Sequence, residues 1–341
     1  MHIALDTMGS DRGPAELVNG ALTALRESPM QISLVGDEQA ISAALGDRYP
    51  KESIHIVATS QVVEMDDSPT MVVRRKKDSS MLRAFELHAR GEVDAVVSAG
   101  NSGAVMAAAI KHLGRLETIQ RPAIATVFPT LKSPVVMLDV GANVDCRANH
   151  LYQFGVMASA FYQAMFAASE PRVGLLSIGA EDSKGNALVK KTFDLLESSS
   201  LNFIGNVEGG DTFKGDVDVI VCDGFVGNVC LKISEGLAEA VTSMLREEIS
   251  KTFTAKMGYL LAREAFKNFK KRVDYAEYGG APLLGLNGTG IICHGRSNAT
   301  AIKNAILVAD GLAGSGVNDH ILAMLAHDGD LASGKEEQEK K

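Results

Sequence analysis

Short apolar runs without alternation recur along this 341-residue chain, and they restrict its fold more than any other feature. Residues 95–97, 173–176 and 219–222 are examples, because each is continuously apolar. Such runs are typical of strands buried on both faces, as in a parallel sheet covered by helices. Helical stretches separate the runs, so the sequence predicts a doubly wound α/β sandwich with a mostly parallel sheet. Ligands of such folds bind at the carboxyl ends of the strands.

The expected strands are residues 2–6, 31–35, 53–57, 94–98, 135–140, 172–178, 218–222 and 290–293. A further run, Ala123–Phe128, is separated from 135–140 by a short segment with a proline at each end, which favours a hairpin. We therefore expect part of the sheet to be antiparallel. The sequence has no internal repeat and no Pro/Gly/Ser-rich linker, so residues 1–328 are predicted to form one α/β domain. The charged tail, 329–341, is predicted to be disordered.

Composition and charge narrow the class of protein. Apolar residues make up 46% and charged residues 22%, as in soluble globular proteins. No run reaches the roughly 18 apolar residues that span a bilayer. The first twenty residues read as a strand and an acidic loop, so we expect no secretory signal and a cytoplasmic location. The net charge of −8 argues against general nucleic-acid binding, and the four cysteines lack metal or disulfide spacing.

The first loop of the chain indicates an anion site. An apolar run ends at Asp6, the chain turns through Gly9 and Gly13, and Pro14 begins a helical pattern. Such a junction directs backbone N–H groups and the positive end of a helix dipole toward one small volume. The same strand–loop–helix design recurs at least three more times. The sequence therefore predicts an enzyme or binding protein for a phosphate-bearing ligand.

Five loops carry the other candidate side chains: Asn101 and Ser102 in 98–107, Asn143 in 139–147, Lys184 in 179–186, Asp223 and Asn228 in 223–229, and His294 in 292–298. Each has an ordinary alternative. The first loop is equally a plain connector, the second and fourth supply helix N-caps, the lysine is equally a solvated surface cation, and a structural role is favoured for the histidine. A lysine at a strand end can meet an anion, or protonate a leaving group if its pKa is lowered.

Standard nucleophile and nucleotide motifs are absent: there is no G-x-S-x-G elbow, no Walker loop and no clean G-x-G-x-x-G. Cys222 lies in an apolar strand and is favoured as a core residue. The aspartates show no metal-ligand spacing, so neither a metal nor a cofactor is predicted. If the chain is an enzyme, direct transfer between two bound substrates is favoured over a covalent intermediate.

Two basic segments stand out on this acidic chain. Residues 74–77 form a block of four positive charges before an N-capped helix, either solvated or facing an anionic partner. Residues 251–272 carry seven basic residues against one acid, a net charge of +6. On a helix, four of these cations form a stripe beside an apolar face. This pattern favours an amphipathic helix on an anionic membrane, with packing on the core or a dimer interface as the alternative.

The loops above belong to a longer series of motifs: DTMGSDRGP at 6–14, RRKKDSSM at 74–81, SAGNSG at 98–103, LDVGAN at 138–143, GAEDSKGN at 179–186, NVEG at 206–209, DGFVGN at 223–228 and YGGAPLLG at 278–285. In this order they resemble the bacterial phosphate acyltransferase family of phospholipid synthesis, PlsX, over roughly residues 1–310. Two positions depart from the family pattern. Ser10 stands where a second glycine is expected, and Ser102 where threonine is expected.

The resemblance implies transfer of a fatty acyl group from acyl carrier protein to orthophosphate, with acyl phosphate and free carrier protein as products. It also implies a three-layer α/β/α sandwich similar to phosphotransacetylases and isopropylmalate dehydrogenases. A homodimer and peripheral association with the inner face of the cell membrane are implied as well.

This chemistry assigns expected roles to the candidate residues. Phosphate is itself the nucleophile, so no enzyme serine or cysteine is required. We expect Lys184 to polarise the thioester carbonyl or to position phosphate, and Asn228 to donate a hydrogen bond to the oxyanion or to phosphate. The expected substrate-binding residues are Asp6, Gly9, Asn101, Ser102, Asn143, Asp223 and His294.

Acyl carrier protein is acidic, so either basic segment is a candidate dock. The block consists of Arg74, Arg75, Lys76 and Lys77. The membrane is assigned to the second segment, because only there does charge accompany an apolar face; the contacting residues would be Lys256, Leu260, Leu261, Arg263 and Lys267. Two rival functions remain. A nicotinamide-dependent dehydrogenase would need a nucleotide loop and a metal-binding aspartate set that the sequence does not show. A non-catalytic phosphate- or acyl-binding protein can be distinguished from an acyltransferase only by measuring turnover.

Overall fold

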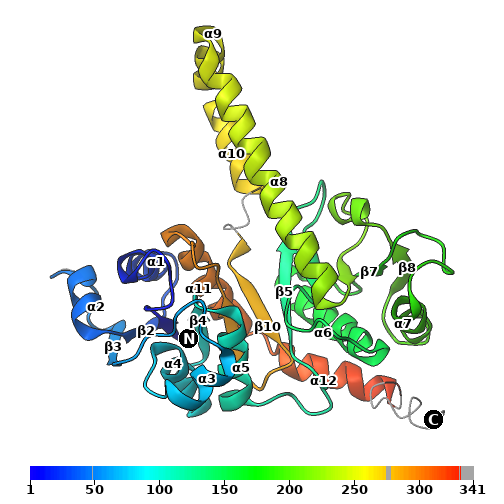
Figure 1. Cartoon of the computed structure of the whole chain (residues 1–341), viewed down its shortest axis with the longest axis horizontal. Coiled ribbons are helices and arrows are strands. Elements are labelled where there is room, and N and C mark those ends of the chain that lie inside the picture. The colour runs from blue at the N-terminus through cyan, green and yellow to red at the C-terminus, as the bar shows by residue number, and fades with distance from the viewer. Residues whose placement is uncertain (48, 274–277, 330, 332–341) are drawn as a thin grey trace.

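A single eleven-stranded sheet runs through the computed structural model, which describes residues 1–47, 49–273, 278–329 and 331 (Figure 1). The strand order is β3-β2-β1-β4-β11-β10-β5-β6-β9-β7-β8. The strands are β1 His2–Asp6, β2 Gln31–Gly36, β3 Ile54–Ala58, β4 Ala95–Ser98, β5 Ala123–Phe128, β6 Val135–Leu138, β7 Val173–Leu176, β8 Phe203–Val207, β9 Val219–Val221, β10 Ala281–Leu284 and β11 Thr289–Ile292. The predicted α/β class with a mostly parallel sheet is confirmed. Residues 330 and 332–341 of the predicted tail lie outside the described residues.

The sheet consists of two parallel sets joined by antiparallel pairings. Strands β3, β2, β1, β4 and β11 are parallel to one another, and so are β6, β9, β7 and β8. Between them, β10 is antiparallel to both β11 and β5, and β5 is antiparallel to β6. The β5–β6 pairing confirms the predicted hairpin, with Ala125 opposite Leu138 and Phe128 opposite Val135.

Helices cover both faces of this sheet. The helices are α1 Pro14–Glu27, α2 Glu38–Leu45, α3 Pro69–Arg75, α4 Ser80–Ala89, α5 Ser102–Leu113, α6 Ala148–Phe166, α7 Ala187–Glu197, the 3-10 helix η1 Gly209–Phe213, α8 Gly224–Lys251, α9 Phe253–Leu261, α10 Arg263–Val273, α11 Ala299–Ala313 and α12 Val317–Asp328. Successive residues of β1 enter opposite cores: Leu5 belongs to the core that contains Phe154 of α6, and Ala4 to the core that contains Phe85 of α4. This burial on both faces confirms the three-layer α/β/α sandwich.

A helical arm made of α8, α9 and α10 projects from the sheet (Figure 1). Helix α8 is 28 residues long and reaches far beyond the strands, α9 lies at the tip, and α10 follows in the returning chain. The prediction of one continuous helix over 251–272 is wrong. The chain breaks at Thr252, whose side chain accepts a hydrogen bond from the Ala255 N–H and so caps α9, and again at Ala262.

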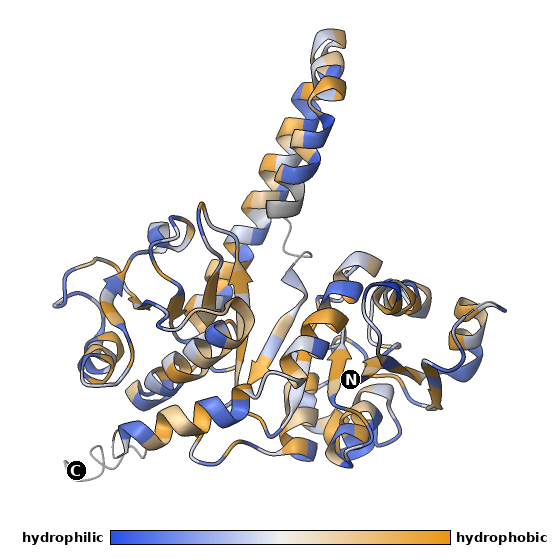
Figure 2. Ribbon diagram, turned by 180° about the vertical axis from the view of Figure 1, so that it is seen from behind, coloured by the Kyte–Doolittle hydropathy of each residue, from blue (hydrophilic) through white to orange (hydrophobic). Residues whose placement is uncertain are grey.

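Apolar and polar residues alternate along the arm (Figure 2). Large apolar side chains that remain exposed on α8 are Phe225, Val226, Val229, Ile233, Leu237, Val241, Met244 and Leu245; on α9 and α10 they are Phe253, Met257, Tyr259, Leu260, Leu261 and Phe269. The side chains of residues 270–273 lie outside the described part. Within the described residues, no helix is both long and apolar enough to cross a bilayer.

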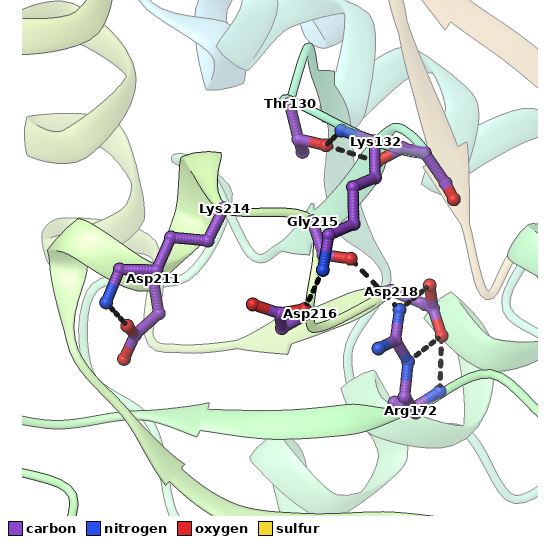
Figure 3. A network of polar contacts seen from close by, with 9 residues as sticks. Thr130, Lys132, Arg172, Asp211, Lys214, Gly215, Asp216 and Asp218 are labelled. Atoms are coloured by element: carbon purple, nitrogen blue, oxygen red, sulfur yellow. Dashed lines mark hydrogen bonds and ion pairs between the residues drawn. The ribbon is translucent and has the colours of Figure 1, made fainter.

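A polar network connects the residues just before β7 and β9 with each other and with the turn of the β5–β6 hairpin (Figure 3). Arg172, just before β7, forms a two-pronged ion pair with Asp218, just before β9, at 2.9 Å for each nitrogen–oxygen contact. Lys132, in the turn of the β5–β6 hairpin, pairs with Asp216 of the same loop. These contacts connect the hairpin turn to β7 and β9, at the ends of these two strands away from their carboxyl-end loops.

Candidate active site

A cavity of about 330 Å3 lies where α8 meets the sheet. Its walls come from the loops after β4 and β6, from β5, from one face of α8, and from the chain around β10 and β11. The lining residues are Ser102, Ile124, Thr126, Val127, Val140, Gly141, Asn228, Leu231, Lys232, Glu235, Tyr278, Gly280, Ala281, Ile292, Cys293, His294, Ser297 and Ala301. The structure thus brings together three of the predicted site residues, Ser102, Asn228 and His294.

The first turn of α8 fixes the position of Asn228. Asp223 caps this helix, because its carboxylate accepts hydrogen bonds from the N–H groups of Phe225 and Val226, each at 3.0 Å. Close approach of the helix to the loop after β6 requires Gly227, where a Cβ atom would lie 2.0 Å from the Asp139 carbonyl oxygen. The capping role that the sequence offered for Asp223 is therefore present, and a ligand contact remains a prediction.

The buried carboxylate of Asp139 organises the loop after β6. One of its oxygens accepts hydrogen bonds from the N–H groups of Ile124, Gly141 and Ala142, at 3.1 to 3.2 Å. The other accepts from the backbone N–H of Asn143 at 2.6 Å and from its side-chain amide at 2.9 Å. Burial raises the pKa of Asp139, and these donors act in the opposite direction.

Asn143 itself does not line the cavity. Its amide also donates to the Pro122 carbonyl at 2.9 Å, and its side chain is buried. The side-chain N–H groups of Asn143 thus have partners within the protein, and the expected ligand contact stays a prediction.

Asp6 and Gly9 also lie behind the cavity rather than on its wall. Asp6 is buried and accepts hydrogen bonds from the Ser98 hydroxyl at 2.7 Å and the Met8 N–H at 3.2 Å. Burial raises its pKa. A Cβ atom at Gly9 would lie 2.7 Å from the Gly100 Cα, so the loops after β1 and β4 touch backbone to backbone. Both residues shape loops, and their direct contact with substrate stays a prediction.

At the start of α5, Asn101 and Ser102 have different roles. Asn101 is the N-cap: its side-chain oxygen accepts from the Ala104 N–H, and its amide donates to the carbonyl oxygens of Met65 and Asp67. Asn101 is not among the residues that line the cavity, and its contact with substrate stays a prediction. The exposed Ser102 does line it, at the positive end of the helix dipole.

His294 follows β11 and is exposed at the cavity wall. Its Nδ1 accepts a hydrogen bond from the Arg296 N–H at 3.1 Å, so Nε2 carries the proton of the neutral ring. The ring can thus present a donor to a ligand oxygen.

Lys184 is not among the described residues that line the cavity. It is exposed in the loop after β7, where its N–H donates to the Glu181 carbonyl oxygen at 3.0 Å. The same carbonyl accepts from the Asn206 amide at 2.9 Å, which holds the loop against β8. Strand β9 separates β7 from β6 in the sheet. The catalytic role of Lys184 therefore stays a prediction.

Sequence reasoning missed Lys232 and Glu235, which line the cavity from α8. They follow Asn228 by four and seven residues and so share its helix face. The lysine Nζ lies 2.8 Å from the glutamate Oε2. The expected loop motif ended at Val229. Continuing the helical period beyond that residue would have placed Lys232 and Glu235 on the same helix face as Asn228.

The basic block begins in the last turn of α3, which packs against α5, and its two lysines follow the helix. Arg74, Arg75 and Lys77 are exposed. Lys76 turns inward, pairing with Asp67 at 2.5 Å and donating to the Val62 carbonyl oxygen at 2.7 Å. Three of the four cations are thus exposed, whereas Lys76 already has an ion-pair partner, and its contact with a carrier protein stays a prediction.

Comparison with known proteins places the chain in a family. Residues 1–320 match a family model described as "Fatty acid synthesis protein". The chain belongs to this family. A relative from Geotalea daltonii named phosphate acyltransferase is 53% identical to this member, covering 95% of the chain and 94% of the relative. Another of the same name, from Syntrophotalea carbinolica, is 54% identical, with 95% and 93% coverage.

Solved structures support the fold independently. A phosphotransacetylase from Streptococcus pyogenes is 16% identical to the present chain and superposes on it with a TM-score of 0.63. The match covers 92% of the present chain and 94% of the phosphotransacetylase. This likeness confirms the expected phosphotransacetylase-like architecture and concerns the fold alone.

Proposed function

We propose that this chain transfers a fatty acyl group from acyl-acyl carrier protein to orthophosphate, yielding acyl phosphate for phospholipid synthesis. The observation that carries the proposal is the mixed lining of the cavity. Apolar side chains, among them Ile124, Leu231 and Ile292, adjoin the polar groups of Ser102 and Asn228. The thioester end of an acyl chain and a phosphate dianion can meet in such a cavity. Membership of the family and the names of the 53–54% identical relatives agree with this reaction.

The reaction needs no covalent enzyme intermediate. A phosphate oxygen attacks the thioester carbonyl carbon, the resulting oxyanion collapses, and the C–S bond breaks to release the carrier thiolate, which takes up a proton. A free thiol has a pKa of about 8.5, so this leaving group needs little acid assistance. Cys293 is a poor rival nucleophile, because burial raises the pKa of its thiol to about 12.

Positioning and hydrogen bonds supply the catalysis. Asn228 donates from α8 to the oxyanion or to phosphate, and Ser102 offers its hydroxyl at the start of α5. His294 donates from Nε2 on the facing wall. Lys184 completes the set when the loop 179–186 lies over the cavity with substrate bound, where its ammonium stabilises the developing negative charge.

Carrier protein and membrane are assigned to separate surfaces. The acidic carrier docks on Arg74, Arg75 and Lys77, beside the α5 wall of the cavity, so that charge reversal at Arg74 and Arg75 raises the KM for acyl carrier protein but not for orthophosphate. The arm forms the homodimer contact along α8. Its tip contacts the anionic inner face of the cell membrane through Lys256, Leu260, Leu261, Arg263 and Lys267.

The decisive experiment incubates the purified chain with palmitoyl-acyl carrier protein, with and without orthophosphate, and follows release of the carrier thiol. The expected result is phosphate-dependent release, with acyl phosphate trapped by hydroxylamine. A folded protein that binds these ligands without releasing thiol would be the non-catalytic binding protein instead, and the transferase proposal would fail.

A further inference from the structure

The electrostatic character of the cavity comes mainly from two side chains of α8. Among the described lining residues, Lys232 is the sole lysine or arginine, and Glu235 is the sole carboxylate. Their side chains are 53% and 19% exposed, so the glutamate is mostly enclosed while about half of the lysine side chain remains exposed.

This pair differs from an ordinary exposed ion pair, which contributes little to stability. It stands on the cavity wall, one and two turns beyond Asn228, and the facing walls carry Ser102 and His294. A phosphate dianion that leaves water for this cavity needs a counter-charge as well as neutral donors. Of the described lining residues, only Lys232 can supply a permanent positive charge.

We propose that Lys232 is the phosphate-binding cation of the cavity and that Glu235 is a positioning residue that holds its ammonium at the wall. An ammonium has three N–H donors, so it can keep its bond to Glu235 while donating to a phosphate oxygen. The carboxylate also restricts the flexible lysine stem, so that less conformational freedom is lost when phosphate binds. The inference rests on the proposed function and adds a named phosphate ligand to it.

Two sources can supply the phosphate chemistry: free orthophosphate, or the phosphodiester of the carrier's pantetheine arm. The proposal commits to orthophosphate. As a dianion it carries one more negative charge than a phosphodiester, so it gains more from a fixed cation. The kinetic measurement separates the two sources, since one variant is assayed against each substrate in turn.

The test compares Lys232→Met with Lys251→Met, a matched lysine of the same helix that pairs with Glu248 outside the cavity. We expect Lys232→Met to raise the KM for orthophosphate roughly 10- to 100-fold, as for loss of a charged hydrogen bond, while the KM for the acyl carrier and the melting temperature stay unchanged. Lys232→Arg should recover part of the affinity. Glu235→Gln should raise the same KM by a smaller factor with kcat unchanged.

Direct titration of the chain with inorganic phosphate alone separates this inference from the function. If the wild type binds phosphate, Lys232→Met weakens that binding and neither releases thiol, the transferase would be rejected and the phosphate site supported. Equal phosphate KM and equal phosphate affinity in wild type and Lys232→Met would overturn the inference even with full turnover. A KM increase confined to the acyl carrier would overturn it too, in favour of the phosphodiester, and a wild type that neither binds phosphate nor turns over would reject both.

Discussion

Asp139 is a buried carboxylate whose five hydrogen-bond donors are all neutral groups. It therefore acts as a local centre around which the loop after β6 folds, and no cation is needed nearby. The sequence identified the loop as polar and functional but did not separate Asp139 and Asn143, which face inward, from Val140 and Gly141, which reach the cavity. Residue type and position at a strand end do not encode which way a loop turns its side chains.

For Lys184, the prediction is a loss of turnover without a loss of stability. Lys184→Ala should lower kcat by about a hundredfold, because a preorganised positive charge near the developing oxyanion is removed. The melting temperature should not change, since the side chain is exposed. Steady-state kinetics with palmitoyl-acyl carrier protein provide the check, with Lys190→Ala, an exposed lysine of α7, as the control. Turnover equal to wild type would remove Lys184 from the mechanism.

A pH-dependent loss of stability is expected from His150. Burial, followed by repulsion from Arg121 and Arg147, lowers its pKa from 6.5 to about 4. The neutral ring of the folded state therefore contributes fully above pH 6.5, and this contribution falls as the pH drops from 6.5 toward 4, because the unfolded chain binds the proton first. Thermal unfolding between pH 7.5 and 4.5 should show a steeper decline for wild type than for His150→Gln. Parallel curves would contradict the assignment.

At the scale of elements, the sequence predicted most strands correctly because their apolar runs are continuous, as in β4 and β9. It missed β8 and β10 for identifiable reasons. Strand β8 lies at the sheet edge and is half exposed, so its pattern lacks a continuous apolar run. Strand β10 follows two glycines and contains Pro282, a residue that argues against a central strand.

The tip of the arm gives the element-scale prediction. Glutamate at Lys256, Arg263 and Lys267 together should weaken binding to vesicles of anionic lipid by at least about a hundredfold, since each basic residue near such a surface contributes about 1 kcal/mol. Vesicle co-sedimentation measures this. The control places glutamate at Lys51, Lys190 and Lys191, which carry the same charge change on the body of the molecule. Equal binding by the two triple variants would show that net charge, not the tip, determines attachment.

On the scale of the whole molecule, the sheet explains why the predicted site was only partly assembled. The two parallel sets run in opposite directions, so the loops at their carboxyl ends do not all meet on one edge. Ser102 and His294 come from one set and Asn228 follows a strand of the other, yet they share the cavity, whereas Lys184 does not. Strand order and direction decide this grouping, and local sequence does not contain them.

The exposed apolar side of α8 predicts a second copy of the chain. Ile233, Leu237 and Met244 are each more than 60% exposed, which is costly along a projecting helix unless another surface covers them. Aspartate at Ile233 and Leu237 should convert a dimer to a monomer while the body stays folded. Sedimentation equilibrium checks the mass, with Leu131→Asp as control, because Leu131 is an even more exposed apolar residue, in the hairpin turn. A wild type that is already monomeric would refute the dimer.

Helix α8 carries Asn228 at one end and leads at the other to the tip that we propose to bind the membrane, so it would act as a rigid spacer between the two. About 23 residues separate Asn228 from Lys251, or roughly 35 Å at about 1.5 Å per residue. That length is close to the thickness of the hydrocarbon core of a bilayer, about 30 Å. If α8 stands perpendicular to the membrane, the apolar product leaves the cavity far from the lipid. If α8 lies parallel to the membrane, the cavity is close to the lipid surface. If the proposed attachment holds, the tilt of one helix sets how far acyl phosphate travels through water.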